Sequence, residues 1–97
     1  MTVQVIMEVA LKDGGEQEFR DFMREIIADT RAYQGCVSIE FTRNQDSPNE
    51  LLVMEKWDSR ADYEKYLQWR METGALTRMA DAFDGQPKLR FFDPLGL

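Results

Sequence analysis

Apolar residues recur at every second position in residues 3–10 and 36–43, a period typical of β-strands with one buried face, and two further short apolar segments follow at residues 51–57 and 88–92. The pattern predicts strands over residues 3–10, 36–43, 51–57 and 88–92. In the first strand the residues predicted to share one face are Val3, Val5, Met7 and Val9, and in the second they are Val37, Ile39 and Phe41. Residues 44–49 are rich in Asn, Asp, Ser and Pro and predict a short turn, so the second and third strands should form an antiparallel hairpin.

Two other segments carry apolar residues at every third or fourth position, which predicts amphipathic helices. The first helix is expected from Glu16 until the stop at Gln34-Gly35. The second is expected to begin after the cap Asp58-Ser59 and to break at Gly74, with helical spacing continuing to Phe83.

The predicted order is strand, helix, strand, strand, helix, strand. This order is typical of the ferredoxin-like split βαβ fold, an α+β fold in which an antiparallel sheet carries helices on one face. A length of 97 residues suits one compact domain spanning 1–97. Periodicity alone leaves the order of the strands in the sheet open.

The third predicted strand begins with apolar residues on both of its faces, and only one face can meet the helices. The other face would then expose a patch formed by Ile6, Leu52, Met54 and Phe92. Monomeric proteins seldom expose such a patch, so we expect a homodimer in which a partner's sheet covers it.

Charge and composition narrow the classes of partner. The formal net charge of -6 would repel a phosphate backbone, so we expect no nucleic-acid partner. Residues 1–8 have no basic leader and mix polar with apolar residues, which predicts neither a signal peptide nor a membrane span. We therefore expect a cytoplasmic protein that does not bind membranes.

The chain has no histidine and one cysteine, Cys36. These facts exclude Ser-His-Asp and Cys-His catalysis, histidine-rich zinc sites and axial histidine ligation of haem. No metal site is expected, and any acid–base chemistry falls to carboxylates, tyrosine or lysine.

Two segments, Thr30-Arg31 through Gly35-Cys36 and Glu55-Lys56-Trp57-Asp58-Ser59, together with their spacing, resemble the antibiotic-biosynthesis-monooxygenase family. The resemblance spans nearly the whole chain. It implies a dimeric α+β barrel with a small-molecule pocket between the sheet and the helices of each subunit. It also implies oxidation of a small aromatic substrate, such as a quinol, anthrone or similar polyketide, by molecular oxygen without a metal or other cofactor.

The resemblance also suggests pocket residues. Trp57 and Tyr63 match a tryptophan and a tyrosine that line the family's pocket, and Arg78 lies close to an arginine found in some members. Two positions depart from the family pattern. Val53 stands where anthrone oxygenases have a substrate-contacting asparagine, and Tyr66 stands where many members have a histidine.

For an oxygenase, our hypothesis is that Arg78 stabilises a phenolate, Tyr63 or Tyr66 exchanges protons, and Trp57 packs against the substrate ring. Each of these residues also has a purely structural interpretation. Trp57 would suit a core position at a strand end, the tyrosines would suit helix positions with hydroxyls bonded to water or backbone, and Arg78 would suit a surface ion pair.

A buried carboxylate is the alternative base. Burial of Glu55 or Glu40 would raise its pKa toward neutrality, although either residue could instead face solvent. Two other functions fit the same pattern. One is an isomerase or lyase acting on small hydroxy-ketones, and the other is a non-catalytic dimer that binds a small ligand.

Overall fold

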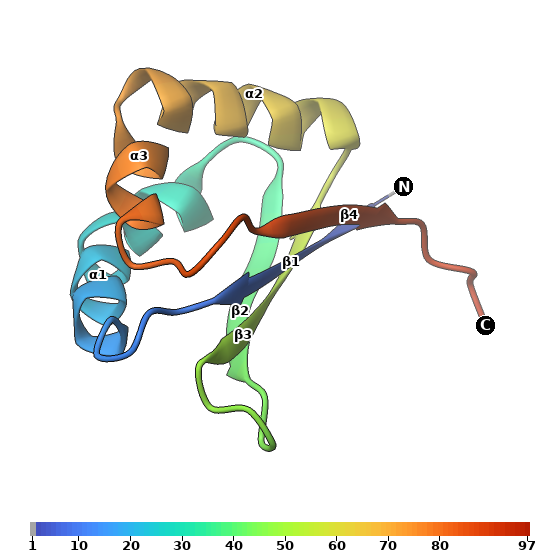
Figure 1. Ribbon diagram of the computed structural model, residues 1–97. Coiled ribbons are helices and arrows are strands. Elements are labelled where there is room, and N and C mark those ends of the chain that lie inside the picture. Colours follow the sequence, from blue (N-terminus) through green and yellow to red (C-terminus); the bar gives the residue numbers. More distant parts are fainter. Residues whose placement is uncertain (1) are drawn as a thin grey trace.

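The computed structural model describes residues 2–97 and places three helices on one face of a four-stranded antiparallel sheet (Figure 1). The elements are β1 (Val3–Ala10), α1 (Glu16–Ala32), β2 (Cys36–Arg43), β3 (Glu50–Trp57), α2 (Arg60–Glu72), α3 (Ala75–Ala80) and β4 (Lys88–Phe92). The strand order β2-β3-β1-β4, which periodicity left open, puts the first strand between the third and the last. This is the ferredoxin-like α+β fold that the sequence predicted.

The predicted elements are confirmed, with small differences at their ends: α3 ends at Ala80 rather than Phe83, β3 begins at Glu50 rather than Leu51, and α1 ends before the predicted stop. The helix ends at Ala32 because Tyr33 adopts an extended backbone with φ −68° and ψ 143°. Gly74 stands between α2 and α3 with a left-handed φ of 78°, which explains the break in the helical pattern. None of the helices within residues 2–97 combines the length and apolarity needed to cross a membrane.

One predicted strand face is wrong at its first residue. Cys36 pairs with Trp57 and Ser38 with Lys56, so β2 has one residue more than β3 between these pairs and bulges at this point. Val37 lies in the bulge and is 53% exposed, rather than sharing the buried face of Ile39. The bulge instead turns Cys36 toward the helix side, where it packs against the cluster containing Trp57.

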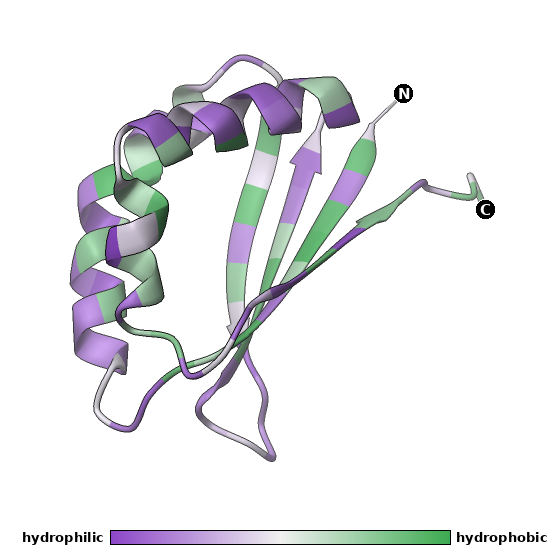
Figure 2. Cartoon of the chain, turned by 45° about the horizontal axis from the view of Figure 1, so that its top comes forward, coloured by the Kyte–Doolittle hydropathy of each residue, from purple (hydrophilic) through white to green (hydrophobic). Residues whose placement is uncertain are grey.

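The core between the sheet and the helices consists of two buried clusters. The first gathers under α2 and consists of Val3, Val5, Trp57, Tyr63 and Tyr66. The second lies near the start of α1 and consists of Val9, Leu11, Phe19, Ala82 and Phe83. Figure 2 shows that the helix surfaces turned away from the sheet are largely hydrophilic, as expected for helices that cover one side of a core.

Gly35 brings the end of α1, the start of β2 and the start of α2 together. Its φ of 92° lies in the left-handed region, and a Cβ at this position would lie 2.6 Å from Cβ of Asp62. The carbonyl of Gly35 accepts a hydrogen bond of 2.7 Å from the backbone N–H of Asp58. Ser59 then caps α2 by accepting a 3.1 Å hydrogen bond from the Asp62 N–H. The Gly35-Cys36 and Asp58-Ser59 segments therefore set where α2 crosses the sheet.

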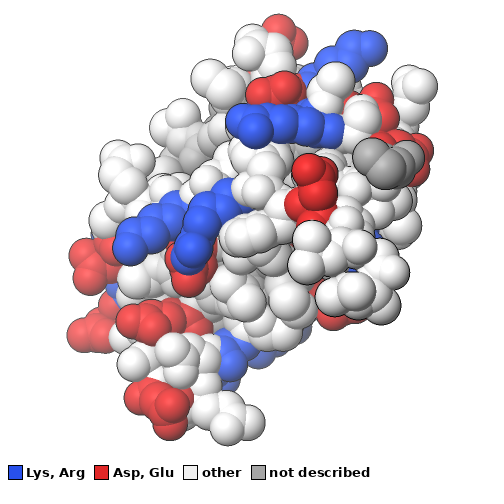
Figure 3. All heavy atoms as spheres, turned by 90° about the vertical axis from the view of Figure 1, so that its right-hand side faces the viewer, with Lys and Arg blue, Asp and Glu red and all other residues white. Residues whose placement is uncertain are grey.

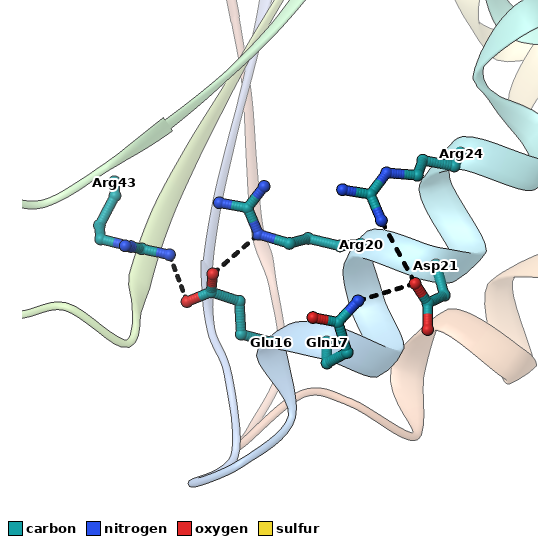
Figure 4. A network of polar contacts seen from close by, with 6 residues as sticks. All are labelled: Glu16, Gln17, Arg20, Asp21, Arg24 and Arg43. Carbon is teal, nitrogen blue, oxygen red and sulfur yellow. Dashed lines mark hydrogen bonds and ion pairs between the residues drawn. The ribbon is translucent and has the colours of Figure 1, made fainter.

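At the opposite end of α1, charged side chains join the helix to β2 (Figure 4). Glu16 forms ion pairs with Arg20, one turn along the helix, and with Arg43 at the end of β2. Farther along α1, Asp21 pairs with Arg24 at 3.4 Å. All these side chains are substantially exposed, so they contribute little to the free energy of folding.

The face of the sheet opposite the helices is uncovered. The side chains of Ile6, Leu52 and Met54 on this face are half-buried, and Phe92 is 44% exposed. Figure 3 views the molecule from the right-hand side of Figure 1 and shows uncharged atoms in the middle of this surface with charged side chains around them.

Candidate functional site

A cavity of about 70 Å³ lies between the helix-facing side of the sheet and the three helices. Its wall is mainly apolar and includes three methionines, Met7, Met23 and Met79. Only five lining residues carry a polar or charged side chain, and they are Thr30, Glu55, Tyr63, Tyr66 and Arg70. The remaining lining residues are Phe19, Ile26, Ile27, Ile39, Phe41, Val53, Leu67, Ala75 and Leu76. An apolar cavity with a few convergent polar groups is the usual form of a small-molecule site.

Among residues 2–97, Glu55 is the only carboxylate that lines the cavity. The middle of β3 carries it, opposite Val5 on β1 and Ile39 on β2, and its side chain is almost completely buried. This burial raises the pKa of the Glu55 carboxyl to about 7, although a hydrogen bond from Trp57 opposes the shift. The protonated and ionised forms of Glu55 are therefore both populated at neutral pH, which is what a general base requires.

Trp57 positions Glu55. Its Nε1 donates a hydrogen bond of 3.1 Å to Oε1 of Glu55, two residues earlier on the same face of β3. The indole ring is fully buried and packs against Tyr63 and Tyr66, with ring centroids 5.5 and 5.0 Å away. Trp57 does not contribute to the cavity wall, so its ring lies behind the carboxylate instead of beside a bound ligand.

Tyr63 lies on α2 and lines the cavity with a buried side chain. Burial raises the pKa of its hydroxyl well above the ordinary value, and the nearby Glu55 and Tyr66 raise it further. Tyr63 therefore remains protonated at neutral pH. It can donate a hydrogen bond to a ligand, but it is unsuited to act as a base.

Tyr66, Thr30 and Arg70 form a closed hydrogen-bonded triangle at the cavity wall. The Tyr66 hydroxyl lies 2.7 Å from Oγ1 of Thr30 and accepts a 3.0 Å hydrogen bond from Nε of Arg70. Nη2 of Arg70 donates to Oγ1 of Thr30 at 2.9 Å and to the backbone carbonyl of Ile26 at 3.0 Å. Because Thr30 and Arg70 both form hydrogen bonds with the Tyr66 hydroxyl, Tyr66 is better placed to orient Arg70 than to exchange protons with a ligand.

Arg70 is an unusual core residue because its side chain is buried, with 4% exposed. Its guanidinium carbon lies 4.4 Å from the centroid of Trp69 and 5.3 Å from that of Tyr66. These aromatic faces and the three hydrogen bonds support a cation away from bulk water.

The structure brings four of the six predicted site residues to the cavity wall, namely Val53, Glu55, Tyr63 and Tyr66. Trp57 does not line the cavity but donates a hydrogen bond to Glu55, which does. Arg78 points elsewhere and pairs with Glu25 at 2.9 Å on the exposed surface of α3 and α1.

The structure differs from the predicted site at two further residues, Glu40 and Arg70. Glu40, the alternative base, is exposed on the open face of the sheet, where it pairs with Met54. The arginine of the cavity is Arg70, which the prediction missed. In the sequence, its signal was a charged residue on the same helical stripe as Tyr63 and Tyr66, four residues after Tyr66.

Two other ionisable features complete the site. Cys36 is partly buried, and burial followed by the nearby Glu55 raises the pKa of its thiol, which keeps it in the unreactive protonated form. Within residues 2–97, no group of three or more His, Cys, Asp or Glu side chains is arranged to hold a metal ion.

Known structures share this fold over more than 90% of their length. A conserved protein from Methanosarcina mazei superposes with a TM-score of 0.86 at 15% identity, covering 95% of this chain and 91% of that one. A Mycobacterium tuberculosis protein superposes with a TM-score of 0.79 at 21% identity, covering 100% of this chain and 98% of that one. SnoaB, a cofactor-independent oxygenase from Streptomyces nogalater, superposes with a TM-score of 0.83 at 14% identity, covering 99% of this chain and 95% of that one.

No curated protein sequence matches the chain. The family model described as antibiotic biosynthesis monooxygenase matches residues 2–71, which include β1, α1, the β2–β3 hairpin and nearly all of α2. This match covers Glu55, Trp57, Tyr63, Tyr66 and Arg70. The chain therefore belongs to the antibiotic biosynthesis monooxygenase family.

Proposed function

We propose that this chain is a cofactor-independent monooxygenase that oxidises a small phenol or quinol with molecular oxygen. The observation that carries the proposal is Glu55, a buried carboxyl with a pKa of about 7 in the wall of an apolar cavity. Membership of the monooxygenase family and the fold shared with a cofactor-independent oxygenase support the same reaction class.

In the proposed reaction the ionised Glu55 takes the phenolic proton, and Tyr63 donates a hydrogen bond to the substrate. The electron-rich phenolate then reduces O2. A ring carbon that is ortho or para to the phenolate oxygen and carries a hydrogen loses that hydrogen and gains one oxygen atom. The second oxygen atom leaves as water with that hydrogen and the phenolic hydrogen. The phenol becomes a quinone, and the four electrons that it loses reduce O2.

The size of the cavity limits the substrate. At about 70 Å³ it is smaller than the roughly 150 Å³ of a cavity known to hold one benzene ring. The flexible side chains of Met7, Met23 and Met79 can move to enlarge it, since unbranched thioether chains adapt to irregular volumes. A single aromatic ring therefore suits this site better than a fused three-ring anthrone.

Oxygen uptake tests this function. Wild-type protein should consume O2 above the background autoxidation with single-ring quinols, and with isotopically labelled O2 the product should gain one labelled oxygen atom. Glu55→Gln should lose most of this activity, and the matched surface variant Glu64→Gln should keep it. Absence of uptake across the panel would refute the proposal. Turnover of hydroxy-ketones without oxygen would favour an isomerase or lyase, and tight binding without turnover would favour a binding domain.

We also propose that a second copy of the chain covers the open face of the sheet, forming a homodimer. The half-buried Ile6, Leu52 and Met54 and the exposed Phe92 give this face an apolar centre, which supports pairing of two such faces. Light scattering over a dilution series should report a dimer at micromolar concentration, and Met54→Glu should shift it toward monomer. A wild-type chain that is monomeric and folded at that concentration would contradict the proposal.

A further inference from the structure

Arg70 brings a positive charge into the protein interior without a negative partner. It forms no ion pair with any carboxylate within residues 2–97, and its three hydrogen bonds end on the neutral oxygens of Tyr66, Thr30 and the Ile26 carbonyl. Removing a cation from water is costly unless an anion or several acceptors compensate it. The described part of the chain supplies the acceptors but not the anion.

The guanidinium group also retains a donor for a ligand. Nε and Nη2 are bonded to protein atoms, whereas Nη1 has no hydrogen-bond partner within residues 2–97. Every completely buried side-chain nitrogen or oxygen in the described structure has a partner, so Nη1 is not completely buried. Arg70 lines the cavity, and the triangle with Tyr66 and Thr30 holds its orientation before a ligand arrives.

The largely uncharged wall of the cavity lets the positive charge of Arg70 favour a negatively charged ligand. Fifteen of the seventeen lining residues carry no formal charge, and the other charged group is Glu55. A ligand carboxylate beside Arg70 would form a charge-assisted hydrogen bond in an apolar environment, where such bonds are strongest. An uncharged ligand of equal size would leave the cation uncompensated.

We propose that the cavity selects a small single-ring ligand bearing a carboxylate and that Arg70 is the residue that determines this specificity. The occupant is an aromatic acid whose ring fills the methionine-lined space and whose carboxylate accepts from Nη1 of Arg70. The nature of the ring as an oxidisable phenol rests on the proposed function, but recognition of the carboxylate does not. The substrate class that follows is a hydroxylated benzoic acid.

Binding of benzoate and of benzamide to the full chain tests the proposal without turnover. The two ligands have nearly the same shape and differ in charge. Calorimetry should give benzoate at least tenfold higher affinity than benzamide, and benzoate should raise Tm more than benzamide at equal concentration because it binds only the native state. Equal affinity for the two ligands, or binding of neither, would overturn the proposal.

Substitutions of two arginines test whether Arg70 is the residue that determines the preference for benzoate. Arg70→Gln should reduce benzoate affinity by about ten- to a hundredfold, the range for loss of a hydrogen bond to a charged group, while benzamide affinity changes by less than about threefold. Arg78→Gln removes an exposed arginine outside the cavity and should leave both affinities unchanged. If Arg70→Gln does not fold, as circular dichroism would show, Arg70→Lys keeps the charge and should retain a preference for benzoate. Loss of the preference in Arg78→Gln would overturn the assignment.

These measurements separate the inference from the proposed function. A preference for benzoate without oxygen uptake from any dihydroxybenzoate would support the carboxylate site and contradict the monooxygenase. Oxygen uptake from neutral quinols without a preference for benzoate would support the monooxygenase and overturn the carboxylate site.

Discussion

Replacing Glu55 with glutamine should make the protein more stable than the wild type at alkaline pH and leave the two similar in acid. Glutamine has nearly the same shape, and its amide oxygen can still accept the hydrogen bond that Trp57 donates to Oε1. The substitution removes the ionisation of a side chain that is 5% exposed. Any change in the pH dependence of stability therefore reports the cost of a buried negative charge.

The pKa of Glu55 sets the size and the sign of this effect. Burial raises that pKa from 4.5 to about 7, and each pKa unit corresponds to about 1.4 kcal/mol. Between these two pH values the unfolded chain has released the proton and the native chain still holds it, so wild-type stability falls as the pH rises. Above pH 7 the buried charge of Glu55 lowers the free energy of unfolding of the wild type by about 3 kcal/mol. Glu55→Gln carries no charge there and does not lose this stability.

Urea denaturation at fixed protein concentration, followed by tryptophan fluorescence between pH 4.5 and 8.5, measures the effect. The free energy of unfolding of Glu55→Gln minus that of the wild type should increase by about 3 kcal/mol across this range. Glu64→Gln, on the exposed side of α2, should show a nearly flat difference. A flat difference for Glu55→Gln as well would refute the reasoning that the carboxyl titrates near neutrality.

Two further substitutions test the geometry around the site. Gly35→Ala should destabilise the protein by about 2 kcal/mol or more, since it adds a clash with Asp62 to a left-handed backbone, whereas Gly14→Ala has the backbone strain without the clash and should cost about 1 kcal/mol. Equal losses in thermal denaturation would contradict the close approach. Tyr66→Phe should cost about 1–3 kcal/mol because Nε of Arg70 loses its acceptor and Oγ1 of Thr30 loses one of its two partners, and Tyr33→Phe, in the same aromatic cluster, should cost under about 1 kcal/mol. Urea denaturation of the two variants would reveal the difference, and equal costs would argue against the triangle.

The fold was largely predictable because its elements depend on local periodicity and on turn residues. Strand alternation placed Val5 and Val9 on the buried face, and the two glycine stops, Gly35 and Gly74, lie shortly after the ends of α1 and α2. Strand order was not predictable in this way because it depends on pairing between distant segments. The exposure of Val37 was missed for a related reason, since a bulge appears only when two strands are paired.

The site was predictable in part. Glu55 follows the alternation of β3, so a buried carboxylate was among the expected possibilities, and Tyr63 and Tyr66 follow the inner stripe of α2. Arg70 continues that stripe, but its burial depends on acceptors supplied by α1, about forty residues earlier in the chain. A charged residue on an apolar stripe is therefore a signal worth following even when a resemblance indicates another arginine.

The role of Glu55 as the base is tested by its own pKa, measured from the 13C chemical shift of its carboxyl group as a function of pH and assigned by comparison with Glu55→Gln. We predict a titration midpoint at about 7, with oxygen uptake rising over the same pH interval as the base ionises. A midpoint close to the ordinary value of 4.5 would contradict both the burial of the charge and the role of Glu55 as the base.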